Sequence, residues 1–260
     1  MADLDLEAAL RRRLDVGGRA FVPYVTGGLP SVTTDVLRGL EAAGADAIEV
    51  GIPFSDPVMD GPVIQEASQR ALEAGATPDR VLDLVGEASV GVPVVAMTYL
   101  NPVLALGFDV FLRRAVDVRL AGVLVPDLPV DEAEEWRSAC AEHGVASVFL
   151  AAPGTDAGRL GLIAEASSGF VYCVSTYGVT GERKVLAQTA RDLVESLRPL
   201  TDRPLLVGVG VGSPEQAATA CEFADGVVVG TALVRKLLEE GPESCLALAA
   251  QFRRAIPAGP

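Results

Sequence analysis

Short apolar runs rich in valine recur along the chain and alternate with stretches whose apolar residues follow the helical period. Runs of this length without polar alternation are typical of parallel strands buried on both faces. The pattern predicts eight strands, at residues 21–26, 47–51, 92–97, 122–125, 146–150, 170–175, 204–209 and 226–229.

The intervening stretches are predicted to be helices, because their apolar residues fall on one face. Capping signals support several of them: Gly44 follows one predicted helix, Asp131 opens another, and Ser213-Pro214 opens a third. The predicted helices span 4–14, 31–43, 63–74, 78–88, 109–120, 131–143, 156–166, 189–197, 213–221, 232–238 and 243–254.

Alternating strands and helices form either an open doubly wound sheet or a closed barrel. Eight such units in 260 residues match the size of a (β/α)₈ barrel. No GxGxxG follows the first predicted strand, which weighs against a dinucleotide-binding sheet. We therefore expect an α/β fold, a (β/α)₈ TIM barrel with extra short helices, as a single domain over residues 1–260.

Composition excludes several classes of protein. The net charge of −14 repels nucleic acid and anionic membranes. The four cysteines lie far apart without metal-ligand spacing, so we expect free thiols in a reducing compartment and no metal site. The single histidine, His143, is expected at a helix end. The N-terminal stretch is acidic and amphipathic rather than a signal peptide, and no run reaches membrane-spanning length, so a cytoplasmic protein is expected.

The stretch 45–62 carries the candidate chemistry. Period-two alternation places Ile48 and Val50 on one face of the predicted strand and Glu49 on the other. A buried carboxylate is costly unless it is paired, protonated or used. Asp56 and Asp60 follow in an irregular segment, and two carboxyl groups in unlike environments can divide acid and base roles. The alternative is a strand glutamate hydrogen-bonded inside the barrel, with both aspartates capping turns.

Glycines cluster after the last three predicted strands, where barrel enzymes often bind phosphate. Gly210 lies in the loop after the seventh strand, and Gly230-Thr231 opens the helix after the eighth. Backbone N–H groups and a helix N-terminus can hold an anion without a basic patch. A further glycine-bearing loop, 175–181, has the composition of a mobile lid. These residues predict a barrel that acts on a phosphorylated small molecule.

Several motifs together resemble the tryptophan synthase α-subunit family, in order and over essentially the whole chain. They are Phe21-Val-Pro-Tyr-Val-Thr, the long stretch 49–65, Pro126-Asp-Leu-Pro129, Gly178-Val-Thr-Gly181, Gly208-Val-Gly-Val211 and Gly230-Thr231. The resemblance implies cleavage of indole-3-glycerol phosphate to indole and glyceraldehyde 3-phosphate without a metal or organic cofactor. It also implies an αββα complex with a β subunit, and pyridoxal phosphate is expected only on that partner.

The resemblance also implies roles for individual residues. Glu49 would be the general acid/base, Asp60 would hold the indole N–H, and Tyr172 would be an active-site tyrosine. The implied substrate-binding residues are Phe21, Leu100, Thr180, Gly181, Gly210, Gly230 and Thr231. The residues implied to face the β subunit are Pro53, Asp56 and Pro57.

Three positions depart from the family pattern. Leu29 replaces an acidic residue, Thr176 stands where the lid often has arginine, and Thr231 replaces a more usual serine. The first two keep a second interpretation open, a free-standing indole-3-glycerol phosphate lyase that releases indole. A third is a non-catalytic activator of a β subunit, although such a scaffold has no need of Glu49 and Asp60. Another phosphate-binding barrel isomerase is the alternative at the level of the fold.

Overall fold

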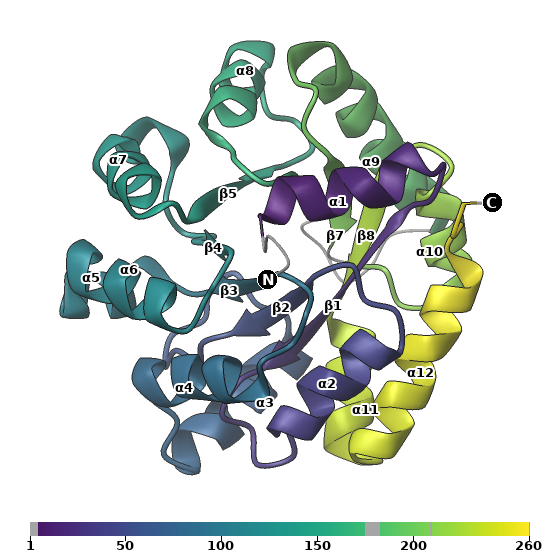
Figure 1. The fold of residues 1–260 in the computed structure, drawn as a ribbon. Coiled ribbons are helices and arrows are strands. Elements are labelled where there is room, and N and C mark those ends of the chain that lie inside the picture. The colour runs from purple at the N-terminus through teal and green to yellow at the C-terminus, as the bar shows by residue number, and fades with distance from the viewer. Residues whose placement is uncertain (1–4, 175–182, 209, 260) are drawn as a thin grey trace.

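The structure, a computed structural model, describes residues 5–174, 183–208 and 210–259. Its strands form a closed parallel barrel in sequence order, and helices surround it (Figure 1). This confirms the predicted TIM barrel. The strands are β1 (Ala20–Thr26), β2 (Ile48–Gly51), β3 (Val94–Met97), β4 (Gly122–Leu124), β5 (Ala146–Ala151), β6 (Val171–Val174), β7 (Leu205–Gly208) and β8 (Gly226–Val229).

Side chains at alternate positions of each strand belong to two different apolar layers. Valines such as Val22, Val95 and Val228 point inward and pack together inside the barrel. Their strand neighbours, Val25 and Val50 among them, pack outward against the helices. Within β2, Ile48 and Val50 pack outward, so Glu49, which lies between them, points into the barrel. The prediction that Glu49 lies on the face opposite to Ile48 and Val50 is confirmed.

The helices match most of the predicted ranges to within a few residues. They are α1 (Leu6–Asp15), α2 (Thr34–Ala42), α3 (Pro62–Glu73), α4 (Pro78–Ala88), α5 (Leu100–Leu106), α6 (Phe108–Asp117), α7 (Glu134–His143), α8 (Ala157–Ala166), α9 (Arg183–Leu197), α10 (Pro214–Ala220), α11 (Thr231–Glu239) and α12 (Pro242–Ala255). Two short 3₁₀ turns, η1 (Val130–Glu132) and η2 (Arg198–Leu200), complete the list.

Three helix predictions need correction. α9 begins at Arg183 rather than at the predicted Thr189. α5 was not predicted, because Pro102 in its sequence reads as a loop; proline is nevertheless compatible with the first turn of a helix. Asp131 does not cap a helix over 131–143: it lies in η1, and α7 starts after Ala133 with no side-chain cap. The predicted cap at Ser213 is confirmed, since its hydroxyl accepts a hydrogen bond from the Gln216 N–H.

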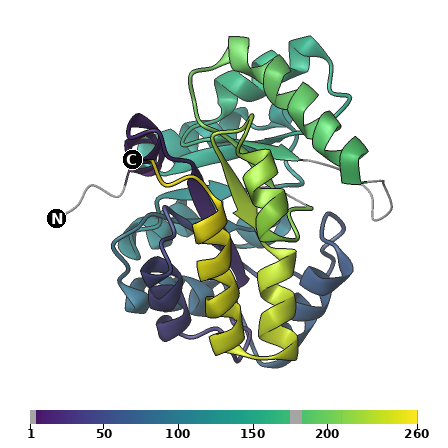
Figure 2. The same ribbon diagram turned by 90° about the vertical axis from the view of Figure 1, so that its right-hand side faces the viewer.

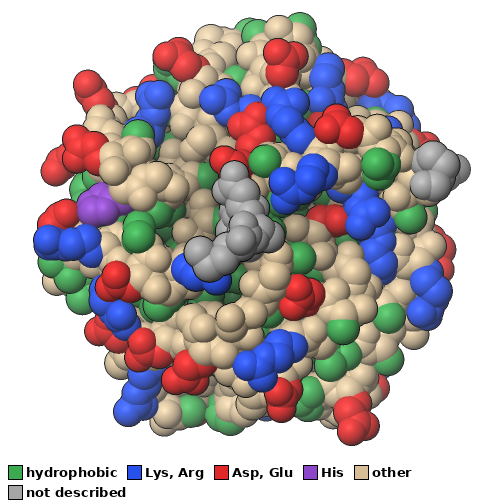
Figure 3. Space-filling model, in the orientation of Figure 1, with side chains coloured by type: hydrophobic (Ala, Val, Ile, Leu, Met, Phe, Trp, Pro, Cys, Tyr) green, Lys and Arg blue, Asp and Glu red, His purple; other side chains and the backbone are tan. Residues whose placement is uncertain are grey.

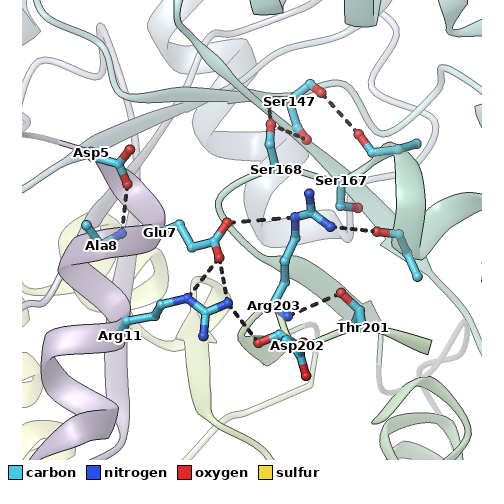
Figure 4. Close-up of polar contacts among 12 residues, drawn as sticks. Asp5, Glu7, Ala8, Arg11, Ser147, Ser167, Ser168, Thr201, Asp202 and Arg203 are labelled. Atoms are coloured by element: carbon cyan, nitrogen blue, oxygen red, sulfur yellow. Dashed lines mark hydrogen bonds and ion pairs between the residues drawn. The ribbon is translucent and has the colours of Figure 1, made fainter. Parts of the chain in front are cut away.

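Helix α1 closes the end of the barrel at which the strands begin. It crosses that end in Figure 1, and Leu6 and Leu10 pack among the interior valines. Glu7 Oε1 accepts two hydrogen bonds from Arg11, and its other oxygen lies 3.7 Å from Arg203 Nε (Figure 4). Arg11 also donates to the carbonyl of Asp202. The space-filling view of this end shows basic and acidic side chains interspersed (Figure 3).

Replacement of Leu10 by alanine is expected to destabilise the protein by about 2–5 kcal/mol, because the side chain is fully buried and its removal leaves a cavity. Arg12→Ala, on the exposed side of α1, is the matched control and should change the free energy of unfolding by less than ~0.5 kcal/mol. Urea unfolding of both variants measures the difference. Equal stabilities would show that α1 does not contribute to the core.

Candidate active site

Glu49 lies inside the barrel near the carboxyl end of β2 and is 2% exposed. Its Oε2 atom is buried and has no hydrogen-bond partner among the described residues. Burial, and to a smaller extent the nearby charge of Asp60, together raise the pKa of Glu49 to about 8. At neutral pH the carboxyl group is therefore largely protonated and can donate a proton.

Asp60 lies on the loop between β2 and α3, facing Glu49. Burial raises its pKa to about 6, while a hydrogen bond with the Tyr99 hydroxyl acts in the opposite direction. Asp60 is thus mainly ionised at pH 7, whereas Glu49 is mainly neutral. The two carboxyl groups occupy the unlike environments that the sequence predicted.

The loop that carries Asp60 is fixed by hydrogen bonds from three sides. The Asp60 N–H donates to the carbonyl of Pro57 at 3.0 Å, and the Gln65 side chain donates to the carbonyl of Asp60 at 2.9 Å. The N–H of Met59 donates to the Tyr99 hydroxyl at 3.0 Å. The position of Asp60 is therefore set by the start of α5 and by α3 as well as by its own loop.

Two inward tyrosines occupy space that glycines leave open. A Cβ at Gly51 would overlap the hydroxyl of Tyr24, and a Cβ at Gly208 would overlap the hydroxyl of Tyr172. Tyr24 is paired in register with Glu49 across β1 and β2, and its hydroxyl lies 3.4 Å from Thr26 Oγ1. Both glycines thus leave room for an aromatic ring inside the barrel, and Tyr24 lies beside Glu49.

The ends of β7 and β8 carry the predicted anion-binding residues. Gly210 has φ of +99°, a backbone conformation that favours glycine, and it is exposed. Gly230 precedes α11, which begins at the exposed Thr231 and has no side-chain cap. Unpaired N–H groups at such a helix start can face an anion.

Other predicted site residues lie elsewhere. Phe21 points outward and stacks on Phe252 of α12 with ring centroids 6.4 Å apart, so it is not in the barrel interior. Leu100 begins α5 and packs in the layer between barrel and helices; its neighbour Met97 faces inward instead. Thr180 and Gly181 fall in 175–182, outside the described residues.

The predicted partner-facing residues differ in exposure. Pro53 is buried, so it offers no surface to another protein. Asp56 is exposed and Pro57 is half-buried. The adjacent Val58 is 79% exposed, which leaves an apolar side chain on the outside of the same loop.

Sequence reasoning missed Tyr24, which lies beside Glu49 on the neighbouring strand β1, and Tyr99, which acts on Asp60 from the start of α5. Alternation along β1 is the signal for Tyr24, because it places Tyr24 on the inward face of the strand and Phe21 on the outward face. No comparable signal was available for Tyr99, since its contact with Asp60 depends on how the 52–61 loop folds.

No helix within the described part of the chain is long and apolar enough to cross a membrane. The same residues include no cluster of histidine, cysteine, aspartate and glutamate able to hold a metal ion. The four cysteines are free and buried. Two surface hollows, of about 710 and 450 Å³, lie at the end of the barrel near α1 and are not lined by Glu49 or Asp60.

A closed (β/α)₈ barrel with paired carboxyl groups and a glycine rim at the strand ends defines a barrel enzyme that handles a small anionic substrate. The family described as tryptophan synthase alpha chain matches residues 11–256. The chain is 48% identical over 222 residues to the tryptophan synthase alpha chain of Carboxydothermus hydrogenoformans, covering 84% of this chain and 83% of that relative. It is 43% identical to that of Gloeobacter violaceus, over 96% of this chain and 91% of the relative.

Solved structures agree. Mycobacterium tuberculosis tryptophan synthase superposes with a TM-score of 0.90 at 38% identity, covering 99% of this chain and 100% of that one. Tryptophan synthase subunit alpha from Legionella pneumophila gives a TM-score of 0.88 at 33% identity, covering 98% of each chain. The chain belongs to the tryptophan synthase alpha chain family and, as a member, is a lyase of tryptophan biosynthesis.

Proposed function

We propose that the chain cleaves indole-3-glycerol phosphate to indole and glyceraldehyde 3-phosphate, with Glu49 as the general acid/base. The observation that supports this proposal is a pair of carboxyl groups with different pKa values, about 8 for Glu49 and about 6 for Asp60. Burial and hydrogen bonding cause this difference. A neutral acid beside an anion is what a retro-aldol cleavage at an indole ring requires.

In the proposed reaction, Glu49 donates its proton to the ring carbon that bears the glycerol phosphate. The ring loses its aromaticity and the nitrogen becomes positively charged, and Asp60 accepts the hydrogen bond of the ring N–H and stabilises that charge. The carbon–carbon bond then breaks, and its electron pair restores the aromatic ring. The hydroxyl on the departing carbon becomes the aldehyde, and its proton returns to Glu49.

The remaining site residues have supporting roles. Tyr172 and Tyr24 both face the barrel interior, which supports contact with the indole ring. Gly210, Gly230 and Thr231 would hold the phosphate through backbone N–H groups and the start of α11, as would Thr180 and Gly181 by resemblance. Neutral donors explain how a chain of net charge −14 binds an anionic substrate.

Gly210→Asp is expected to raise KM at least tenfold, because a carboxylate at the rim repels the phosphate and the position has an unfavourable φ for other residues. Gly161→Asp, on an open part of α8, adds the same charge far from the rim and is the control. Steady-state kinetics on both variants make the comparison. An unchanged KM for Gly210→Asp would show that the phosphate binds elsewhere.

We also propose that the chain works with a tryptophan synthase β subunit in an αββα complex, which would carry the pyridoxal phosphate. The 52–61 loop supports this proposal, because it presents Asp56, Pro57 and Val58 outward while its inner end holds Asp60. A partner bound there could act on Asp60 through one short loop. The chain itself is proposed to need no cofactor, and its free buried thiols favour the cytoplasm.

The test is indole release from indole-3-glycerol phosphate by the purified chain, with and without a cognate β subunit. Slow release that rises on adding the β subunit supports the synthase subunit. Fast release that ignores it would indicate the free-standing lyase instead. No release in either case, with stimulation of the β reaction retained, would indicate a non-catalytic activator.

A further inference from the structure

Tyr99 joins the loop that carries Asp60 to the start of α5. It is 3% exposed, and its ring packs against Phe54 of that loop with centroids 5.2 Å apart. The next residue, Leu100, donates its N–H to Asp127 at 2.9 Å, which fixes the start of α5. The Tyr99 ring is therefore held from both sides, and its hydroxyl has a defined position.

The direction of the Tyr99 proton follows from its partners. A tyrosine hydroxyl has one proton to donate and oxygen lone pairs to accept with. The N–H of Met59 donates to this oxygen at 3.0 Å, so the oxygen acts as an acceptor there. The Asp60 carboxyl group is the other partner of the hydroxyl in its electrostatics, and an ionised carboxyl group can only accept, so the tyrosine proton is directed toward it. A donor aimed at a carboxyl oxygen favours the ionised form.

We propose that Tyr99 is a positioning residue that keeps Asp60 ionised and in place for the substrate N–H. Met59, which precedes Asp60, holds the Tyr99 oxygen in place through its N–H. That oxygen directs its proton to Asp60, so Tyr99 sets both the position and the charge of Asp60. This inference rests on the proposed function for the use of Asp60, but the contact can be tested without substrate.

Among the described residues, no positively charged group contributes to the pKa of Asp60. Glu49 on β2 is an acid, and Tyr24 on β1 adds no positive charge. Asp127 lies beside Tyr99 and is also acidic. Burial favours the neutral form of Asp60, and the Tyr99 hydroxyl is the group that acts against it and lowers the pKa of Asp60.

The experiment is a carboxyl ¹³C NMR titration of the full-length, substrate-free protein, with the Asp60 signal assigned by Asp60→Asn. Tyr99→Phe keeps the ring against Phe54 and removes only the hydroxyl. The pKa of Asp60 is expected to rise from about 6 to ~7 or above, since a hydrogen bond to a charged group is lost. Placing 3-fluorotyrosine at position 99, a stronger donor, should lower it instead.

Gln65→Ala is the matched control. It removes the other side-chain hydrogen bond that holds this loop, to the backbone of Asp60 rather than to its carboxyl group. Loosening of the loop alone would therefore shift both variants alike, whereas the proposal requires a shift only at Tyr99. An unchanged pKa of Asp60 in Tyr99→Phe, or an equal shift in Gln65→Ala, would overturn it.

The kinetic consequence distinguishes this inference from the proposed function. Tyr99→Phe should move the acidic limb of kcat/KM upward in pH with little change above pH 8, where Asp60 is ionised in both proteins. A wild-type chain without lyase activity would refute the proposed function and leave the titration result standing. A wild-type chain with activity and an unshifted acidic limb in Tyr99→Phe would refute the role of Tyr99 alone.

Discussion

Glu49→Gln is expected to fold, to bind indole-3-glycerol phosphate and to lose turnover by about 100-fold to 10,000-fold, the usual contribution of general acid–base catalysis. Glutamine has nearly the same shape as glutamic acid, so it fills the same buried position on β2. Its amide cannot deliver a proton to the ring carbon. Single-turnover measurements of indole release, with binding measured separately by calorimetry, check both halves of the expectation.

Stability gives an independent control for this variant. Burial raises the pKa of Glu49 from 4.5 to about 8, so the folded protein holds this proton more tightly than the unfolded chain does. Glu49 therefore lowers stability progressively as the pH rises from the unfolded value toward 8. Glu49→Gln should lack this loss and be at least as stable as wild type at pH 8. Reduced stability there, or substantial residual turnover, would contradict the assignment.

The wild-type pH profile should reflect the same pair. The proposed reaction requires a protonated Glu49 and an ionised Asp60, so kcat/KM should fall below about pH 6 and above about pH 8. The two groups interact, and the apparent values belong to the pair. A profile that keeps rising above pH 8 would mean that a neutral Glu49 is not required.

Gly51→Ala is expected to destabilise the protein by about 1–3 kcal/mol, because the new methyl group overlaps the Tyr24 hydroxyl in a fully packed interior. Activity should fall about 100-fold, since Glu49 lies two residues away on β2 and a shift of about 1 Å at a catalytic group has that effect. Urea unfolding and steady-state kinetics measure the two effects.

A double-mutant cycle with Tyr24→Phe tests the cause. Removing the hydroxyl takes away the atom closest to the added methyl group, although the ring edge stays close. The double variant should therefore be more stable than the sum of the single effects by about 0.5–3 kcal/mol. Strict additivity would show that the glycine is needed for its backbone rather than for space.

The fold was predictable because its signals are local. Each barrel strand appears as a short apolar run, and Ser213-Pro214 marks a helix start through chemistry confined to a few residues. α5 was not predicted, because proline is compatible both with a loop and with the first turn of a helix, and Pro102 therefore does not distinguish the two. Packing of Val103 and Leu106 into the apolar layer between barrel and helices decided between the two.

The candidate site was predictable in part for the same reason. Glu49 stands out as a carboxylate in an apolar strand, and its face followed from alternation along β2. Alternation also separates Phe21 from Tyr24: Phe21 packs in the layer between barrel and helices, whereas Tyr24 lies beside Glu49. Tyr99 meets Asp60 only through the three-dimensional course of a loop, which no periodicity encodes.

Both ends of the described chain meet at the closed end of the barrel. Gly18 pairs with Ala258, Arg13 donates to the carbonyl of Ala258, and Figure 2 places the two ends on the same side, away from the carboxyl ends of the strands. A tag, a fused protein or a solid support attached at either end would therefore sit behind the enzyme, with the substrate entrance facing away from it. Either end is a suitable attachment point for immobilised lyase assays, and for capture experiments that leave the 52–61 loop open to a β subunit.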